Sequence, residues 1–406
     1  MKSSGTQAQG YGGYLPVAES AVALAQRHTK NLTAKSAFIH GQSPWSSAKA
    51  DRGRFIESRI FLDNSSKTDK IWKIYQRLNH LKVLVTGGTG FIGSHLVEAL
   101  HQRGVQIRCL LRRTSNLKWL RGVPIETVFG DCSEKDSLRE AVKGVDQIFH
   151  LAGVTRATHE RTYFEANAMG TENLIRACLE QNAPIQKFIY LSSQAAAGPC
   201  QNGNKKKESD QCKPVSPYGQ SKRMGEELAL AHAHEFPLLI LRPCAVYGPR
   251  DRDIYSFFRF LSKGIKFCLS GEDQHISLCY VEDIVQAILL AGQAEKPSGE
   301  IFFLSDGQDY RLEEIGDIFA QAMGVKAVCI RIPDWMMTWV ASFSEYLSKL
   351  SGKPSLLNKG KVEEMLHRNW VCDITKARAD LGFEPKISLS QGAKLTFEWY
   401  RKENWL

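Results

Sequence analysis

The chain has 406 residues, of which 43% are hydrophobic, and a chain of this length can bury a sizeable core. Its formal net charge of +10 would by itself suggest a nucleic-acid partner. Residues 1–79, however, hold 12 Lys/Arg and 5 Asp/Glu, so the other 327 residues carry only +3. This distribution argues against a nucleic-acid-binding surface on the main part of the chain.

The sequence predicts neither a membrane span nor a metal site. No stretch approaches the ~20 consecutive apolar residues of a transmembrane helix, and the N-terminus lacks the order of a signal peptide. Ten cysteines without a CxxC pair or zinc-like spacing favour buried, reduced thiols in a cytoplasmic protein. Residues 334–350 are interpreted as an amphipathic helix that packs on the core, with membrane-surface contact as the alternative.

Apolar strands alternate with helical segments from Leu81 onward. Residues 1–79 lack this periodicity and are interpreted as an extension without assigned function, containing one short helix near Lys70–Asn79. The predicted strands are Lys82–Thr86, Gln106–Leu111, Thr127–Phe129, Gln147–Leu151, Lys187–Leu191, Leu238–Leu241 and Gly299–Leu304. Continuous apolar strands separated by helices indicate a parallel sheet covered on both faces. We therefore predict an α/β, Rossmann-type doubly wound sheet over 80–250, with a returning strand near 299–305. A smaller, discontinuous and less regular substrate lobe is expected over most of 251–406.

A glycine-rich turn, Thr86-Gly87-Gly88-Thr89-Gly90-Phe91-Ile92-Gly93, lies between the first strand and a helix. Gly87, Gly90 and Gly93 permit a tight turn and close approach to a pyrophosphate, which the helix N-terminus attracts. The motif resembles that of extended short-chain dehydrogenases/reductases, the NAD(P)-dependent epimerase/dehydratase family, which includes 3β-hydroxysteroid-dehydrogenase-like relatives. The resemblance covers residues 81–406 and implies further cofactor contacts from Phe91, Ile92, Asp131, Leu151, Ala152 and Pro243.

The end of the second predicted strand bears on the choice of dinucleotide. NAD-preferring members of the family carry an acidic residue there, for the ribose hydroxyls. This chain has Leu111, followed by Arg112 and Arg113. Because a guanidinium suits a 2′-phosphate, we predict NADP(H) in preference to NAD(H). The alternative is that the two arginines stack on adenine or face water.

The candidate catalytic residues lie on and near the segment Ser216-Pro217-Tyr218-Gly219-Gln220-Ser221-Lys222. Ser216 and Pro217 predict a helix start, which places Tyr218 and Lys222 on one helix face. A nearby ammonium would lower the phenol pKa and make Tyr218 a general acid/base. The resemblance implies that Lys222 also holds the nicotinamide ribose. It further implies that Ser193, in preference to Ser192, binds the substrate oxygen.

Asn167 resembles the helix-borne asparagine that supports a proton relay to the lysine in this family. The alternative is an asparagine that only satisfies neighbouring backbone groups.

The substrate is less well specified. Ala245 replaces the asparagine of the LRPxNVYGP pattern of many nucleotide-sugar enzymes, and Ile276 occupies the place of their diphosphate-binding arginine. Arg250, Arg252 or Lys263 could substitute. The pattern at 370–385 resembles 3β-hydroxysteroid-dehydrogenase-like relatives, and the helix before it could wall an apolar pocket.

We therefore predict hydride transfer to or from a hydroxy or keto carbon of an apolar, sterol- or isoprenoid-like compound. A nucleotide-sugar epimerase/dehydratase is the alternative. A non-catalytic dinucleotide-binding sensor or assembly factor is the third, against which the complete Ser193/Tyr218/Lys222 set argues. The resemblance also implies a homodimer.

Overall fold

The computed structural model describes residues 81–200, 204–271, 273–351, 355 and 358–406. These belong to one unit, Asn79–Leu406, which is described here by itself. The helix predicted near Lys70–Asn79 lies outside the described residues.

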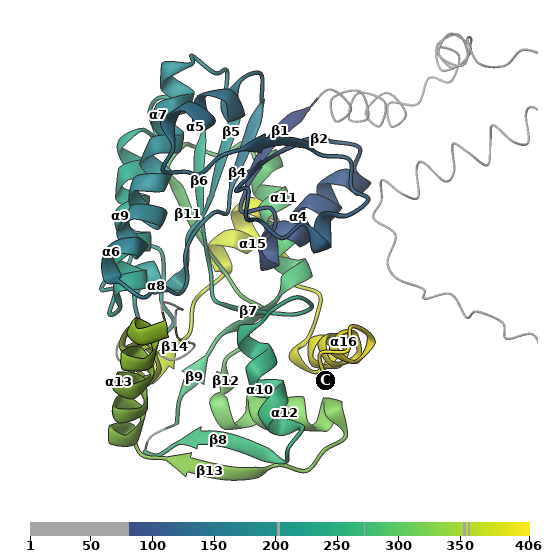
Figure 1. The fold of residues 1–406 in the computed structure, drawn as a ribbon, viewed down its shortest axis with the longest axis vertical. Coiled ribbons are helices and arrows are strands. Elements are labelled where there is room, and N and C mark those ends of the chain that lie inside the picture. The colour runs from purple at the N-terminus through teal and green to yellow at the C-terminus, as the bar shows by residue number, and fades with distance from the viewer. Residues whose placement is uncertain (1–80, 201–203, 272, 352–354, 356–357) are drawn as a thin grey trace, which may run out of the picture. The chain divides into compact units, whose positions relative to one another are not determined.

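A sheet of seven parallel strands forms the centre of the larger of the two lobes of this unit (Figure 1). Its order is β11-β6-β5-β4-β1-β2-β3, and every neighbouring pair is parallel. The strands are β1 (Lys82–Thr86), β2 (Gln106–Leu111), β3 (Glu126–Phe129), β4 (Gln147–His150), β5 (Lys187–Leu191), β6 (Leu238–Pro243) and β11 (Glu300–Leu304). The predicted Rossmann-type sheet is therefore confirmed. Strands β2 and β3 are added on one side of β1 and strands β4, β5, β6 and β11 on the other, so the topological switch point lies between β1 and β4.

Helices cover both faces of the sheet, as continuous apolar strands require. On one face, α5 (Lys135–Val142), α7 (Gly170–Glu180) and α9 (Pro217–Ala231) pack side by side. Leu84, Ile148, Phe188 and Ile240 point toward these helices in one continuous core. The other face is covered by α4 (Phe91–Gln102) and α11 (Val281–Gln293), which contact each other.

The rest of the unit forms a smaller lobe around a second, aromatic core. Within it, Phe258 stacks on Phe319 and meets Tyr400 edge to face, which joins α10 (Asp253–Leu261), α12 (Leu312–Met323) and α16 (Leu389–Lys402). Short strands complete the lobe: β7 (Ala245–Tyr247), β8 (Ile265–Leu269), β9 (His275–Ile276), β10 (Leu278–Tyr280), β12 (Tyr310–Arg311), β13 (Val328–Ile332) and β14 (Asn369–Trp370). The lobe, predicted to be less regular than the sheet, also holds α13 (Asp334–Ser351), α14 (Lys359–Leu366) and α15 (Thr375–Leu381).

The cysteines depart from the sequence prediction at one place. Cys268 of β8 and Cys329 of β13 form a disulfide, so the expectation that all thiols are reduced is wrong for this pair. The two strands are parallel neighbours, which brings together residues 61 apart in sequence. The other eight cysteines are free thiols, and all of them except Cys212 are buried.

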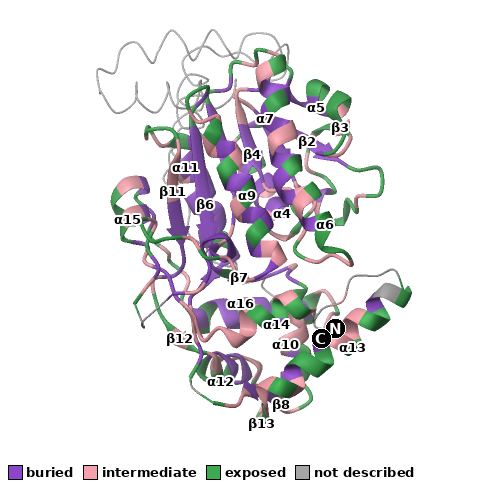
Figure 2. Cartoon of the chain, turned by 90° about the vertical axis from the view of Figure 1, so that its left-hand side faces the viewer, coloured by how far each residue is buried: buried purple, intermediate pink, exposed green. Residues whose placement is uncertain are grey.

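Helix α13 also differs from the sequence prediction. Among the described residues of α13, Met337, Ala341 and Ser348 are buried, and the first two pack with Val362 of α14. The expectation that the helix buries its apolar side chains in the core is wrong, because most of them are exposed (Figure 2). The exposed set is Trp335, Trp339, Val340, Phe343, Tyr346, Leu347 and Leu350. Within the described part of the chain, no helix combines the length and hydropathy needed to span a bilayer.

Candidate active site

The glycine turn leaves no room for side chains where β1 meets α4. A Cβ on Gly93 would lie 2.1 Å from the Gly87 carbonyl oxygen, and a Cβ on Gly87 would lie 2.7 Å from the Ala152 nitrogen. Gly87 also has a φ of +72°, which a side chain disfavours. Phe91 and Ile92 open α4 directly after this turn. The arrangement fits a pyrophosphate held at a helix N-terminus.

Buried hydrogen bonds fix the neighbouring ends of β1 and β4. The Thr86 hydroxyl contacts His150 Nδ1 at 2.7 Å and accepts a hydrogen bond from the Ala152 amide at 3.1 Å. His150 Nε2 contacts the Thr171 hydroxyl at 2.9 Å. Burial lowers the pKa of His150 to about 3, so the ring is neutral. Leu151 and Ala152 are thus held beside the glycine turn, where the family resemblance places the cofactor.

Arg112 and Arg113 lie on the surface directly after β2. Arg113 stacks over the Phe129 ring at 5.4 Å, while Arg112 Nε is 4.0 Å from a carboxylate oxygen of Asp131. Asp131 itself accepts hydrogen bonds from the backbone and hydroxyl of Ser133. Leu111 is buried, so no acidic side chain stands at the end of the strand. Both guanidinium groups are therefore accessible to an anionic ligand beside the nucleotide-binding edge.

Tyr218 and Lys222 lie one turn apart on α9, whose N-terminus is capped by Ser216. Lys222 is 4% exposed, and its Nζ donates to the Leu191 carbonyl oxygen at 2.7 Å and lies 4.5 Å from the Tyr190 ring centroid. Desolvation lowers the pKa of Lys222 to about 7, while the Glu226 carboxylate acts in the opposite direction. The lysine is therefore held at the end of β5, and a pKa of about 7 means that its protonated and neutral forms are both present near neutral pH.

The expectation that the phenol pKa is depressed is wrong for this structure. Burial raises the pKa of Tyr218 to about 12, against a smaller opposite effect of its hydrogen bond with Ser193. The neighbouring lysine does not reverse this, because its ammonium is directed toward Leu191 and is itself partly neutralised by desolvation. Tyr218 is consequently a neutral phenol at pH 7, which is the form that can donate a proton.

The two adjacent serines after β5 have different surroundings. Ser193 caps the short helix α8 (Gln194–Ala197), is half-buried and contacts Tyr218. Ser192 is buried and donates to Glu226 at 2.6 Å. The structure thus brings Ser193 to Tyr218 and directs Ser192 into a separate buried network.

Asn167 lies in the π-helical segment η2 (Phe164–Met169) and is fully buried. Its side chain pairs with both backbone groups of Val154, at 2.7 and 3.0 Å, and donates to Ser221 at 2.9 Å. Gly153 lies between the two side chains, because a Cβ built on it would be 3.0 Å from Asn167 Oδ1 and 3.9 Å from Lys222 Nζ. The observed contacts favour a role in holding the loop after β4 beside Lys222, the alternative left open by the sequence.

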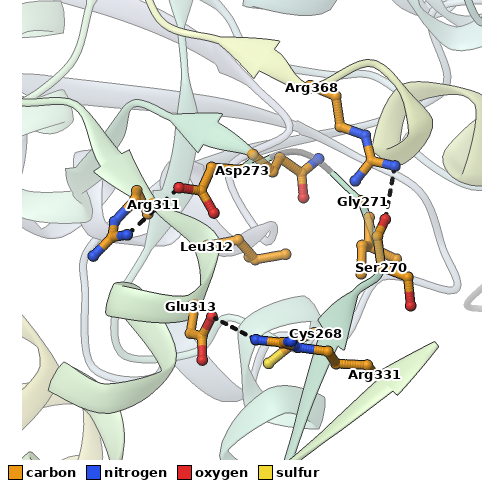
Figure 3. Close-up of a pocket in the computed structure, with 11 residues that line it drawn as sticks. Cys268, Ser270, Gly271, Asp273, Arg311, Leu312, Glu313, Arg331 and Arg368 are labelled. Carbon is orange, nitrogen blue, oxygen red and sulfur yellow. Dashed lines mark hydrogen bonds and ion pairs between the residues drawn. The ribbon is translucent and has the colours of Figure 1, made fainter. Parts of the chain in front are cut away.

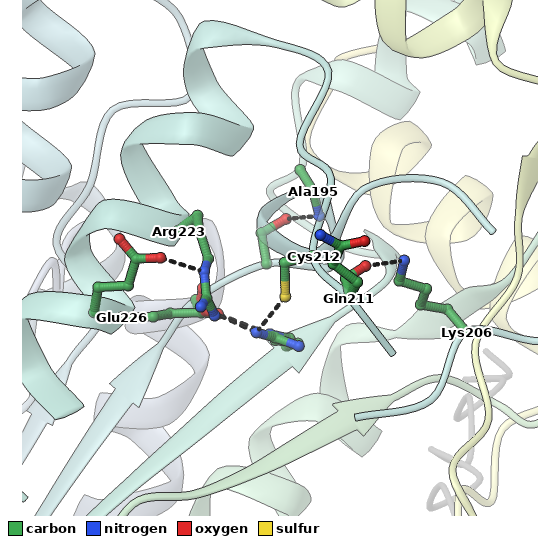
Figure 4. A network of polar contacts seen from close by, with 10 residues as sticks. Ala195, Lys206, Gln211, Cys212, Arg223 and Glu226 are labelled. Carbon is green, nitrogen blue, oxygen red and sulfur yellow. Dashed lines mark hydrogen bonds and ion pairs between the residues drawn. The ribbon is translucent and has the colours of Figure 1, made fainter. Parts of the chain in front are cut away.

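A buried charge network behind the site was missed by the sequence analysis (Figure 4). Glu226, on α9 one turn after Lys222, pairs with Arg242 of β6 at 2.7 and 2.8 Å, and the two side chains are at most 1% exposed. Arg242 Nη2 also contacts the Cys212 sulfur at 3.3 Å. The spacing of Glu226 from Lys222 could have indicated a shared helix face, but its partner on β6 could not be read from sequence. The network ties α9 to the sheet, and Pro243 follows Arg242 at the end of the same strand.

The residues considered for binding a substrate diphosphate are dispersed. Arg250 pairs with Glu98 of α4 at 2.6 Å and donates to Ser94, so it is engaged on the Rossmann half. Arg252 and Lys263 are exposed. These three basic residues therefore do not form a cluster in place of the missing anchors at Ala245 and Ile276.

A separate cavity of about 330 Å³ lies in the lobe, bordered by the end of β8 and the start of α12 (Figure 3). None of the predicted site residues lines it. Its arginines face carboxylates: Arg311 is 3.4 Å from Asp273, and Arg331 is 3.9 Å from Glu313. This cavity is not the place where Tyr218, Ser193 and the glycine turn converge.

A pyrophosphate turn at the carboxyl edge of a doubly wound sheet, close to a Tyr–Lys–Ser set, is typical of an NAD(P)-dependent short-chain dehydrogenase/reductase. Residues 83–304 match the NAD-dependent epimerase/dehydratase family, and the chain belongs to this family. It is accordingly an enzyme of an NAD(P)-dependent class.

Relatives of known description include both reductases and epimerases. The chain is 31% identical over 328 residues to a ceramide reductase of Caulobacter vibrioides, covering 80% of this chain and 96% of the relative. It is 28% identical to a 3-beta-hydroxysteroid dehydrogenase of Mycolicibacterium neoaurum, over 79% and 91% of the two chains. Among solved structures, a UDP-glucose 4-epimerase of Thermotoga maritima with UDP-glucose is similar, with a TM-score of 0.67 and 25% identity, covering 80% of this chain and all of that one.

Proposed function

We propose that this protein is an NADP(H)-preferring reductase or dehydrogenase that acts on an apolar hydroxy or keto compound. The observation that carries the proposal is the contact between Ser193 and a protonated Tyr218, with Lys222 held one helical turn away. Two hydroxyls can then bind the oxygen of a carbonyl substrate, and one of them carries the proton that reduction requires.

The proposed chemistry divides between the chain and its cofactor. The bound nicotinamide supplies the hydride in reduction or accepts it in oxidation. Ser193 polarises the substrate carbonyl, and Tyr218 donates its phenolic proton to the oxygen as the alcohol forms. Lys222, held by the Leu191 carbonyl, would bind the ribose and assist reprotonation of Tyr218. Asn167 would act indirectly, as a positioning residue for the loop at Val154.

The preference for NADP(H) rests on the end of β2. Arg112 and Arg113 are exposed there, and the buried Leu111 offers no carboxylate to the ribose hydroxyls. A 2′-phosphate would gain charge-assisted hydrogen bonds from a guanidinium. Asp131, 4.0 Å from Arg112, is the competing partner for that charge.

The apolar substrate class rests on the missing polar anchors and on the relatives. A buried diphosphate requires charged partners, and Ala245 and Ile276 provide none, while Arg250 is engaged by Glu98. The ceramide reductase and the hydroxysteroid dehydrogenase named above act, by their names, on lipids.

A nucleotide-sugar epimerase is the second candidate, favoured by the structural similarity to the Thermotoga maritima enzyme. In that case the hydride would return to the same substrate, and the cofactor would stay bound through many turnovers.

The test is a fluorescence titration of the full chain with NADPH and NADH, for the wild type and for Arg112→Ala. We expect tighter NADPH binding, weakened about tenfold by Arg112→Ala while NADH binding is unchanged, as one charge-assisted contact implies. NADPH consumption is then followed with a 3-ketosteroid, a long-chain ketone and UDP-glucose, with Tyr218→Phe as the inactive control. Equal binding of both dinucleotides, or a tightly retained NAD with turnover of UDP-glucose only, would overturn the proposal in favour of the epimerase.

A further inference from the structure

The exposed face of α13 is unusual for a protein surface exposed to water. Seven apolar side chains lie on it, and the two tryptophans, Trp335 and Trp339, are 67% and 73% exposed. Successive members are one, three or four residues apart, which places all of them within one face of a helix of 18 residues. Contiguous apolar patches of this kind mark binding surfaces, because burying them releases free energy.

The charges of the helix are arranged away from this stripe. Asp334 pairs with Arg368 at 2.6 Å, and Glu345 accepts a hydrogen bond from the Lys359 amide at 2.7 Å. No acidic side chain among the described residues of α13 is therefore exposed on the apolar face. The segment that follows, 349–361, contains four lysines and no acidic residue, and Lys359 and Lys361 are exposed. Helix α14, which carries Lys359 and Lys361, packs on α13. An apolar stripe beside exposed lysines complements a surface that is apolar inside and negatively charged at its boundary.

The aromatic side chains narrow the choice of partner. Trp335, Trp339 and Tyr346 each combine an apolar ring with a polar N–H or O–H group, and within the described residues these groups make no hydrogen bond. Such side chains prefer the boundary between lipid headgroups and acyl chains, where the ring contacts the acyl chains and the polar group is hydrated. An in-plane amphipathic helix has this composition.

The structure also connects α13 to the candidate active site. Asn358, at the start of α14, donates to the Tyr163 hydroxyl at 3.1 Å, and the Tyr163 ring lies 6.3 Å from that of Tyr218. Glu364 of α14 is hydrogen-bonded to Ser216, the cap of α9, at 2.5 Å. Helix α14, on which α13 packs, therefore lies against the end of α9 that carries Tyr218.

We infer that α13 docks on the surface of an anionic lipid bilayer, with its aromatic stripe in the headgroup region and the exposed Lys359 and Lys361 of α14 beside lipid phosphates. The docked helix would place the Tyr218 site next to the membrane. The further consequence that substrate enters from the bilayer rests on the proposed function, whereas docking itself does not.

The experiment is flotation of the full chain with vesicles of phosphatidylcholine alone or mixed with phosphatidylglycerol, without cofactor or substrate. We expect binding that increases with phosphatidylglycerol and decreases with salt. Trp335→Gln/Trp339→Gln/Phe343→Gln should lower the partition coefficient about tenfold or more, since three exposed anchors are lost. The matched control, Leu117→Gln/Met224→Gln/Phe260→Gln, removes three exposed apolar side chains outside α13 and should float like the wild type.

Circular dichroism and dinucleotide titration would verify that both triple variants are folded. Flotation of the α13 variant equal to the wild type, or no flotation of the wild type, would overturn the proposal. Analytical ultracentrifugation distinguishes the other occupant: a wild-type dimer that does not float and becomes monomeric in the α13 variant would assign the stripe to a second copy. Failure of ketone reduction with normal flotation would count against the proposed function alone.

Discussion

Substitution of Glu226 by glutamine tests how much of the site's rigidity depends on the buried charge pair behind it. The carboxylate accepts hydrogen bonds from Arg242 at 2.7 and 2.8 Å, from Ser192 at 2.6 Å and from Arg223 at 3.3 Å, and it is fully buried. Glu226→Gln would leave the Arg242 guanidinium, 1% exposed, without a counter-charge. Breaking one side of such a pair typically costs about 3–5 kcal/mol. We therefore expect the free energy of unfolding to fall by about that amount.

The assay is urea denaturation followed by circular dichroism, with the slope of the transition compared between proteins. Glu227→Gln is the matched control, because Glu227 is the next residue, 58% exposed, and pairs only on the surface with Arg223. It should change the free energy by less than about 0.5–1 kcal/mol. Ser192→Ala, which removes one hydrogen bond to the carboxylate, should fall between the two, near 1.5–3 kcal/mol as an order-of-magnitude figure. If Glu226→Gln proved no more destabilising than Glu227→Gln, the argument for an essential buried pair would be refuted.

Three further predictions concern the site directly. Gly93→Ala should destabilise the turn by about 1–3 kcal/mol and weaken dinucleotide binding, because its Cβ would lie 2.1 Å from the Gly87 oxygen; isothermal titration that finds wild-type affinity would contradict this. Tyr218→Phe should lower the rate of ketone reduction about 10²–10⁴-fold with dinucleotide affinity retained, measured by steady-state kinetics; a small loss would mean that another group donates the proton. The folded pKa of Lys222, about 7, lies below its ordinary 10.5, so the unfolded chain binds more protons between these pH values and wild-type stability rises across that range. Urea titrations at pH 7 and 10.5 measure this rise in the free energy of unfolding, and in Lys222→Met the rise should be smaller by about 3–4 kcal/mol. An unchanged pH dependence in the variant would show that the buried ammonium is not desolvated.

The central sheet was predictable because its chemistry is local. Each strand is a short apolar run, and the glycine turn and the start of α9 are marked by adjacent residues. The predicted and observed bounds of β1, β2 and β5 coincide for this reason. The lobe was not predictable in the same way, since its strands β9, β12 and β14 have only two residues each and depend on partners far along the chain.

The errors have a common physical origin in long-range contacts. The Cys268–Cys329 disulfide joins strands 61 residues apart, and the Glu226–Arg242 pair depends on how α9 lies on the sheet. The pKa of Tyr218 also depends on burial by distant segments, which sequence spacing to Lys222 does not report. For α13, helical periodicity distinguishes an apolar face from a polar one but does not specify what covers the apolar face.

The return of the chain to the sheet at β11 has a practical consequence for any attempt to separate the two halves. A chain ending near residue 250 would lose β11, the parallel neighbour of β6, and would expose the backbone edge of a fully buried strand. It would also lose α11, whose Ile284 and Ile288 are completely buried. Such a fragment is expected to aggregate rather than to bind dinucleotide. The cofactor-binding half is therefore expected to fold only with a strand and a helix that are synthesised after the first segments of the lobe, and a stop before residue 304 would impair both halves together.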